Sequence, residues 1–341
     1  MNEPDIDDII AEAIGGSTGP GRLVTFGEAY IVLESGSRDR LEHANIAHIA
    51  VGGPELNAAA AYACLEHEAD WVSTVSDSPF GRRTLRAARA ANVGTANVQV
   101  AEGRTGIKFA EAGVEPRMAT VVMDTGNSVF ASRRSGGYDW GAILEGASAL
   151  YFSGAALGVS AAVRQDAVAA MTTASNMGVI VAFDLDYRPD HWSEAEARRT
   201  ISGIVRHTDV LFATRQNLEL FFGIEGAYDV AMRSAIEKIG VAAVAMLRER
   251  SRGTGRITLE GLAMGKNGSM AISTSHTVDV VDGGGASDAF AAGFLAGYLD
   301  DPAAITRAVS LGAAMGALVQ TMPGEMLIAT KDEIEVLANA G

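Results

Sequence analysis

Apolar positions along the chain from residue 71 onward alternate between two patterns. Short runs rich in Val, Ile, Ala and Phe are typical of buried strands, and longer segments with apolar residues three and four positions apart are typical of helices. This βαβα order predicts an α/β fold with a mostly parallel sheet and helices on both faces. Predicted strands cover residues 22–28, 71–77, 149–153, 179–185, 210–213 and 241–247, and predicted helices cover 79–92, 160–176, 193–207, 217–222 and 229–240.

Four further short strands are predicted in the first part of the chain, at 31–34, 43–51, 105–112 and 119–124. The strands at 31–34 and 43–51 could form a small antiparallel layer. Because no helices separate these early strands, they indicate a small β insertion beside the main sheet. Residues 248–255 are polar and basic and contain Gly253 and Gly255, so we expect a mobile loop there. The 341 residues suffice for one large α/β domain or two small ones.

Residues 280–290 hold the most specific local pattern. Val280 and Val281 are predicted to end a strand, three glycines turn the chain, and a helix begins with Asp288 in its first turn. Glycines let a ligand approach the backbone, and the free N–H groups at a helix start favour an anion such as a phosphate. A carboxylate beside that anion could accept a proton from an attacking hydroxyl. The alternative is a glycine turn in which Asp288 only complements the helix dipole.

A second glycine pair, Gly52-Gly53, precedes an alanine-rich helix that contains Asn57. Paired glycines permit close approach of a ligand, and the Asn57 amide could hydrogen-bond to it. An ordinary strand-to-helix turn explains the pattern equally well.

The formal net charge of −15 argues against a nucleic-acid binder and against a partner at an anionic membrane surface. An anionic substrate would therefore need a local cluster of donors. Cys64 is the single cysteine, which excludes an internal disulfide and fits a reducing compartment. No apolar run is long enough to span a bilayer. Residues 1–21 are acidic and then rich in Gly, which indicates a flexible tail, and they lack the basic start of a signal peptide. We therefore expect a cytoplasmic location.

The sequence lacks the motifs of several common classes of enzyme and metal-binding protein. The six histidines have no metal-ligand spacing, and the chain has neither a nucleophile elbow nor a Walker-type loop. A nicotinamide-dependent oxidoreductase would share the fold class, but its glycine fingerprint is missing.

Several short stretches resemble the ribokinase (PfkB) family of carbohydrate kinases. Residues 282–288 resemble its Asp-x-x-Gly-Ala-Gly-Asp signature, and residues 52–57 and 76–81 resemble its Gly-Gly…Asn and Gly-x-Asp-x-x-Gly patterns. Further stretches resemble the 2-keto-3-deoxygluconate kinase branch, namely 25–28, 104–107, 183–189, 247–249 and 321–325. The similarity runs from about Leu23 to the C-terminal helix in the family's order, which is more specific than any one motif.

The resemblance implies a three-layer α/β/α sandwich formed by residues 22–341, with a β lid built from about 29–51 and 104–125. It implies transfer of the ATP γ-phosphoryl group to a hydroxyl of a sugar or sugar acid, with Mg²⁺ as cofactor. The family's general base falls on Asp288, and its anion hole falls on the backbone of Gly285, Ala286 and Ser287. Nucleotide contacts are expected at Thr214, Arg215, Arg248, Asp282 and Gly283.

Sugar contacts fall on Glu28, Gly52, Gly53 and Asn57 by the same resemblance. In the keto-deoxy-gluconate branch an arginine holds the substrate carboxylate, and its position here is Arg188. A planar guanidinium can grip a carboxylate with two hydrogen bonds, and Arg188 would supply the local positive charge that the acidic chain requires. A structural salt bridge is the alternative for this residue.

The chain departs from the family pattern on the nucleotide side. Residues 214–217 read Thr-Arg-Gln-Asn, so the usual Asn-x-x-Glu lacks its glutamate. Met246 replaces a usual threonine or lysine, and Ser287 replaces the last signature glycine. These changes predict that magnesium and nucleotide binding are weakened or rerouted, through waters or through Arg215 and Arg248.

Residues expected to contact the acceptor also depart from the family pattern. Lys108 stands where the branch often has tyrosine, residues 123–125 replace a common Tyr-x-Arg, and Asp186 replaces an asparagine. The acceptor could therefore differ from 2-keto-3-deoxygluconate. Lys108 would add positive charge to the lid, which fits an acidic or phosphorylated acceptor, unless it is an exposed lysine without a role.

Two functions follow from these observations. The first is an ATP-dependent kinase for a sugar or a 2-keto-3-deoxygluconate-like sugar acid. The second is a catalytically impaired relative that binds a sugar acid as a sensor or scaffold. Because family members often pair through the lid, the resemblance also implies a homodimer.

Overall fold

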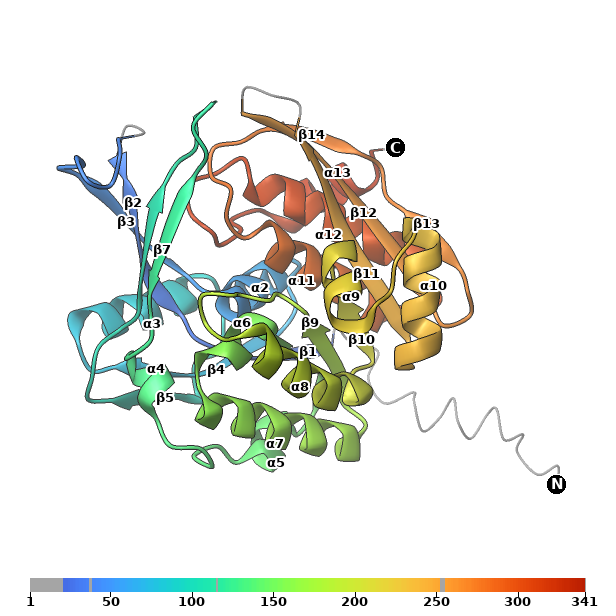
Figure 1. Ribbon diagram of the computed structural model, residues 1–341, viewed down its shortest axis with the longest axis horizontal. Helices are drawn as coiled ribbons and strands as arrows, with labels where there is room; N and C mark the ends of the chain where they lie inside the picture. Colours follow the sequence, from blue (N-terminus) through green and yellow to red (C-terminus); the bar gives the residue numbers. More distant parts are fainter. Residues whose placement is uncertain (1–20, 37–38, 115, 252–254, 341) are drawn as a thin grey trace.

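The computed structural model describes residues 21–36, 39–114, 116–251 and 255–340. Among them, ten strands form one large sheet and four form a smaller one, with helices packed on both faces of the large sheet (Figure 1). The expected tail lies outside the described residues except for Gly21. None of the described helices has the length and apolar character needed to cross a membrane.

The large sheet has the strand order β13-β12-β11-β10-β9-β8-β1-β4-β5, and β14 pairs with β12. Pairing is parallel from β5 to β11 and antiparallel from β11 through β12 to β13 and β14. The expected mostly parallel α/β fold is therefore confirmed. The strands are β1 Arg22–Phe26, β4 Ala69–Ser76, β5 Val98–Ala101, β8 Ala147–Ser153, β9 Ile180–Asp184, β10 Val210–Phe212, β11 Ala243–Ser251, β12 Arg256–Gly265, β13 Met270–Ile272 and β14 His276–Asp279.

Alternate residues of the central strands enter two hydrophobic cores. Leu23 and Tyr151 lie in a core with α2 (Pro54–Ala63), α11 (Ala286–Asp300) and α12 (Ile305–Val319). Their neighbours Val24 and Phe152 lie in the opposite core. That second core contains residues from α4 Val129–Ser132, α5 Trp140–Leu144, α6 Gly154–Val159, α7 Ala161–Met177, α8 Glu194–Ile204, α9 Arg215–Phe222 and α10 Tyr228–Ile239. The remaining helices are α3 Pro79–Ala90 and α13 Lys331–Ala338, with a short 3₁₀ turn at Val205–His207.

The smaller sheet has the order β3-β2-β6-β7. Its strands are β2 Tyr30–Ser35, β3 Ala47–Gly52, β6 Ile107–Glu111 and β7 Thr120–Asp124. The β2–β3 and β6–β7 pairs are antiparallel, and β2 and β6 pair in parallel. The expected antiparallel pairing of the strands at 31–34 and 43–51 is therefore confirmed as β2 and β3. The two antiparallel pairs join through the parallel contact between their first strands, β2 and β6.

The predicted loop at 248–255 is also partly wrong. Strand β11 continues through Ser251, because β12 runs antiparallel to it and hydrogen-bonds along its whole length. Residues 252–254 lie outside the described residues. Val280 and Val281 follow β14 rather than end a strand, although the helix after the glycines is present as α11.

Candidate functional site

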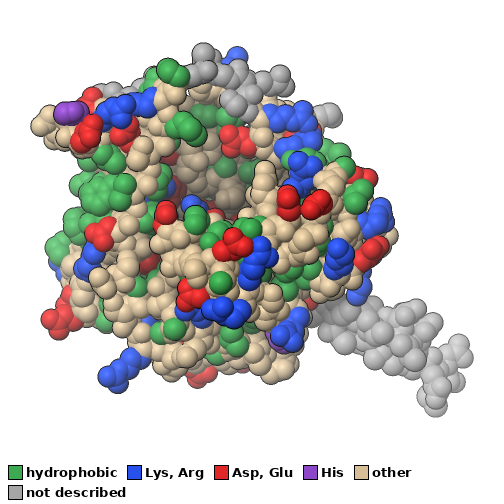
Figure 2. Space-filling view, in the orientation of Figure 1, with side chains coloured by type: hydrophobic (Ala, Val, Ile, Leu, Met, Phe, Trp, Pro, Cys, Tyr) green, Lys and Arg blue, Asp and Glu red, His purple; other side chains and the backbone are tan. Residues whose placement is uncertain are grey.

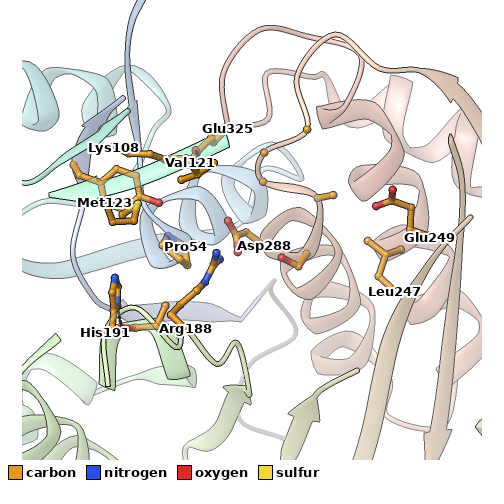
Figure 3. A pocket seen from close by; sticks show the side chains of 17 residues that line it. Pro54, Lys108, Val121, Met123, Arg188, His191, Leu247, Glu249, Asp288 and Glu325 are labelled. Atoms are coloured by element: carbon orange, nitrogen blue, oxygen red, sulfur yellow. Dashed lines mark hydrogen bonds and ion pairs between the residues drawn. The ribbon is translucent and has the colours of Figure 1, made fainter. Parts of the chain in front are cut away.

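A cleft of about 450 Å³ lies between the small sheet and the start of α11. Figure 2 shows it as a hollow, and Figure 3 shows the side chains that converge on it. The carboxyl ends of β9 and β11 approach the same place, as expected for a site at the strand ends of a parallel sheet. Its lining includes Tyr30, Pro54, Lys108, Val121, Met123, Ala155, Arg188, His191, Leu247, Glu249, Gly283–Asp288 and Glu325.

The glycine loop shapes one wall of this cleft. Gly285 is the N-cap of α11 with φ of +77°, and no side chain caps the helix start. A Cβ atom at Gly285 would overlap the carbonyl oxygen of Glu325, so only glycine fits. The expected nucleotide residue Asp282 accepts hydrogen bonds from the N–H groups of Gly284 (2.9 Å) and Gly324 (3.0 Å). Its carboxylate therefore fixes the loop.

Asp288 lies in the first turn of α11, borders the cleft and is only 7% exposed. Its Oδ2 accepts a 2.9 Å hydrogen bond from Nδ2 of Asn57 on α2. Burial raises the pKa of Asp288 to about 7, with further increases from Asp186 and Glu325, against the opposing effects of Asn57 and Arg188. A carboxyl group with this pKa can exchange a proton near neutral pH.

Glu325 has a central position that the sequence analysis did not assign to it. It follows α12, is buried, and forms an ion pair with Lys108 of β6. Its Oε2 also lies 3.4 Å from Nδ2 of Asn57. A Cβ atom at Gly52 would overlap this carboxylate, so the glycine gives room to Glu325. In the sequence, Glu325 only ends the stretch 321–325 that resembles the 2-keto-3-deoxygluconate kinase branch, and the resemblance assigns it no role.

Arg188 reaches the cleft from the loop after β9, and its guanidinium points toward Asp288 in Figure 3. Nε and Nη2 both donate to Oδ2 of Asp186, at 2.9 and 2.8 Å. The salt-bridge alternative is therefore present, and the contact with an acceptor carboxylate stays a prediction. Because Nη1 is not used in this contact, the guanidinium retains donor capacity for a ligand.

Glu28 and Gly53 lie behind the main cleft rather than on its wall. Glu28 borders an adjoining pocket of about 20 Å³, together with Tyr30 and Pro54. Burial raises the pKa of Glu28 to about 8. Gly53 has φ of +147°, and a Cβ atom there would overlap the carbonyl oxygen of Glu28. The sugar contacts expected of both residues stay predictions.

Three of the five residues expected at the nucleotide, Thr214, Arg215 and Arg248, do not line this cleft. Thr214 is the N-cap of α9 and accepts from the N–H of Asn217 at 3.1 Å. Arg215 and Arg248 both lie over the ring of Tyr228, at 4.6 and 5.1 Å. Arg248 also pairs with Glu260, and Arg215 borders a second pocket of about 310 Å³.

The described residues do not fit a resident metal ion. They contain no group of three or more His, Cys, Asp or Glu side chains that could hold one. Asn217 stands where the family glutamate is expected, and its amide lies 3.4 Å from the carbonyl oxygen of Leu185. Magnesium binds through carboxylates together with substrate phosphates.

Comparisons with known proteins cover nearly the whole chain. Residues 21–331 match the family described as "pfkB family carbohydrate kinase". The chain is 28% identical to a 2-dehydro-3-deoxygalactonokinase of Haloferax volcanii over 94% of this chain and 97% of that protein. It is 26% identical to a 5-dehydro-2-deoxygluconokinase of Listeria monocytogenes, over 92% of this chain and 95% of that one.

Solved structures show the same similarity. The fold matches a crystal structure of a 2-dehydro-3-deoxygluconokinase of Thermotoga maritima with a TM-score of 0.90 and 28% identity. The match covers 94% of this chain and 99% of the other. The expected ribokinase-like architecture is confirmed by this match.

Proposed function

Because the chain belongs to the pfkB family of carbohydrate kinases, which are phosphotransferases with an alcohol acceptor, we propose that it transfers the ATP γ-phosphoryl group to a hydroxyl of a keto-deoxy sugar acid. The observation that carries this proposal is the buried Asp288, which faces the cleft at the start of α11 with its pKa raised to about 7. The names of the three compared kinases support an acceptor of this class.

Asp288 acts as the general base. As the acceptor oxygen forms a bond to the γ-phosphorus, its proton passes to the Asp288 carboxylate. The bond between the γ-phosphorus and the bridging oxygen breaks, and ADP leaves with the electron pair. A base with a pKa near 7 suits this transfer, because it is half ionised at pH 7, largely ionised at pH 8 and still basic enough to accept the proton.

The start of α11 stabilises the transferring group. The N–H groups of Gly285, Ala286 and Ser287 have no intrahelical acceptor in the first turn, and no side chain caps them. Together with the helix dipole they favour the negative charge on the phosphoryl oxygens. Asp282 and Gly283 support this wall, and Thr214, Arg215 and Arg248 lie toward the far end of an extended nucleotide.

Arg188 holds the acceptor carboxylate, through Nη1 or by exchanging Asp186 for the ligand. Glu28, Gly52, Gly53 and Asn57 lie on the acceptor side of Asp288. Because Lys108 is already paired with Glu325, it adds little net positive charge to the cleft. This pairing favours an acceptor with one carboxylate over a phosphorylated acceptor.

The small sheet, within about residues 29–51 and 104–125, is proposed to serve as a lid that excludes water from the cleft. Its outer face carries an apolar row across all four strands, because Leu33 is in register with Ile49 and Phe109, and Phe109 with Val122. Ile49 and Val122 are exposed, and Figure 2 shows hydrophobic side chains gathered on this side of the molecule. We expect a second copy of the chain to cover this row and so form a homodimer. Sedimentation of wild type and of Val122→Glu, which places a charge in the row, tests this expectation.

A catalytically impaired relative that binds a sugar acid is the second candidate. The observation that favours it is Asn217, whose amide lies against a backbone carbonyl where a carboxylate is usual in the family. Calorimetry with an ATP analogue and Mg²⁺ separates the two functions. An impaired relative binds the sugar acid but not the nucleotide.

A coupled ADP-release screen over hexoses, pentoses, nucleosides and keto-deoxy acids tests the main proposal. We expect turnover with keto-deoxy acids, and Asp288→Asn should lower kcat by about 10²–10⁴-fold. Acceptor binding should persist in that variant. Turnover retained by Asp288→Asn would refute its role as base.

A further inference from the structure

Two side chains that meet across the cleft carry an inference beyond the proposed reaction. Lys108 projects from β6 of the small sheet, and Glu325 lies in the segment between α12 and α13 of the main body. The Lys108 side chain is 17% exposed and that of Glu325 is 5% exposed. At such depth a carboxylate requires a partner, because the charge loses most of its hydration.

Glu325 is also linked to the base. Nδ2 of Asn57 lies 2.9 Å from Oδ2 of Asp288 and 3.4 Å from Oε2 of Glu325. Since both oxygens approach one nitrogen, they lie within about 6 Å of each other. The Glu325 main chain meanwhile packs against Gly285, the N-cap of the helix that carries Asp288.

These contacts form a continuous path from the small sheet through Lys108, Glu325 and Asn57 to Asp288. We propose that Lys108 and Glu325 are positioning residues, which link the placement of the small sheet to the orientation and charge environment of Asp288. When the small sheet covers the cleft, Lys108 neutralises Glu325, and the Asn57 amide is held toward Asp288. When the sheet moves away, Glu325 becomes an unpaired negative charge beside the base.

Other charged and titratable groups also act on Asp288. These groups are Glu55 of α2, Asp184 at the end of β9, Asp186 and Arg188 in the loop that follows, Tyr30 of β2, Tyr151 of β8 and Glu325. Of these groups only Tyr30 lies on the small sheet. Glu34 of β2, also on that sheet, interacts electrostatically with both Lys108 and Glu325. The Lys108–Glu325 ion pair joins that sheet to the surroundings of the base. Removing the charge of Lys108 should make Asp288 harder to ionise, and removing the charge of Glu325 should make it easier.

The inference rests on the proposed function of Asp288 as base, but its test requires neither nucleotide nor acceptor. The full-length protein, labelled with ¹³C at aspartate carboxyl groups, is titrated by NMR between pH 5 and pH 9. The Asp288 resonance is identified as the one that disappears in Asp288→Asn. Wild type is compared with Lys108→Met, Glu325→Gln and the double variant.

We expect the Asp288 midpoint to rise by about one pH unit in Lys108→Met and to fall by about one unit in Glu325→Gln. In the Glu325→Gln background the Lys108→Met change should have a clearly smaller effect, because Lys108 then acts on Asp288 only directly and no longer through Glu325. Equal shifts in both backgrounds, or no shift in either, would overturn the proposal. Lys331→Met is the matched control, because Lys331 pairs with Glu66 away from the cleft.

Turnover provides an independent readout. The acidic limb of the pH profile of kcat/KM should move with the NMR midpoint in each variant, whereas a purely structural role would lower the rate at every pH alike. If no acceptor is phosphorylated, the proposed function fails while the NMR cycle still decides the linkage. Should Lys108→Met or Glu325→Gln fail to fold, Lys108→Gln and Glu325→Ala replace them in the same cycle, and an unmoved midpoint in these variants also overturns the proposal.

Discussion

Asp288→Asn is expected to stabilise the protein above neutral pH while abolishing turnover. Burial is the largest cause that raises the pKa of this carboxyl, so the folded state resists its ionisation. The unfolded chain ionises it at an ordinary pKa near 3.8. Below that value the group is neutral in both states and has no effect on stability. As the pH rises toward 7, ionisation favours the unfolded state, and above the folded-state pKa the effect becomes constant.

The magnitude follows from the two pKa values. A rise from 3.8 to about 7, at 1.36 kcal/mol per unit, corresponds to at most about 4 kcal/mol of lost stability at pH 8. At pH 5 the loss is only about 1.5 kcal/mol, since this pH lies just over one unit above the pKa of the carboxyl group in the unfolded chain. Asparagine removes the ionisation, and its side-chain oxygen can still accept from Asn57. The stability advantage of the variant should therefore grow by about 2.5 kcal/mol between pH 5 and pH 8.

Urea unfolding of wild type and variant at pH 5, 6, 7 and 8 measures this difference directly. Asp190→Asn serves as the control, because Asp190 is exposed and its replacement relieves no burial. A stability difference that stays constant from pH 5 to pH 8 would refute the reasoning. So would a variant that is less stable than wild type at pH 8.

Three further predictions concern the acceptor, the core and the glycine loop. Arg188→Lys should raise KM for a keto-deoxy acid about 10-fold with kcat little changed, and should leave KM for an uncharged sugar unaffected in steady-state assays. Phe294→Ala should lower the free energy of unfolding by about 3–5 kcal/mol in urea titrations, because Phe294 is fully buried and packs edge-on against Phe212 at 5.6 Å. Gly285→Ala should destabilise by at least about 2 kcal/mol more than Gly146→Ala, since both glycines have φ above +70° but only Gly285 faces a backbone oxygen. Equal values for the two glycine variants would show that the overlap with Glu325 relaxes without cost.

The regular part of the fold is predictable because its signals are local. The apolar spacing of helices such as α7 and the buried runs of strands such as β9 match the predicted elements within one or two residues. The strands β12 and β13 were missed, and β14 ends two residues before the predicted strand end, because these strands form an edge in which β12 pairs antiparallel with β11, β13 and β14. Their stability depends on that pairing more than on their own composition.

Residues of the candidate site were predictable only where they lie together in one short sequence motif. Asp288 and its glycine loop lie within a few residues of each other, and the structure places them on the cleft as expected. The contact between Asn57 and Asp288 joins residues 231 positions apart, and that between Lys108 and Glu325 joins residues 217 positions apart. A hydrophobic period along the chain cannot predict such distant pairs. The positive charge of Lys108 was therefore expected to act on a ligand, whereas the structure shows it paired with Glu325.

The origin of the cleft residues in the chain has a consequence for biosynthesis. Lys108 and Asn57 are synthesised before Glu325 and before the helix pair α11 and α12. A nascent chain therefore exposes the apolar faces of α2 and the early strands before their covering helices exist. This core can therefore close only after the segment through α12 has been synthesised.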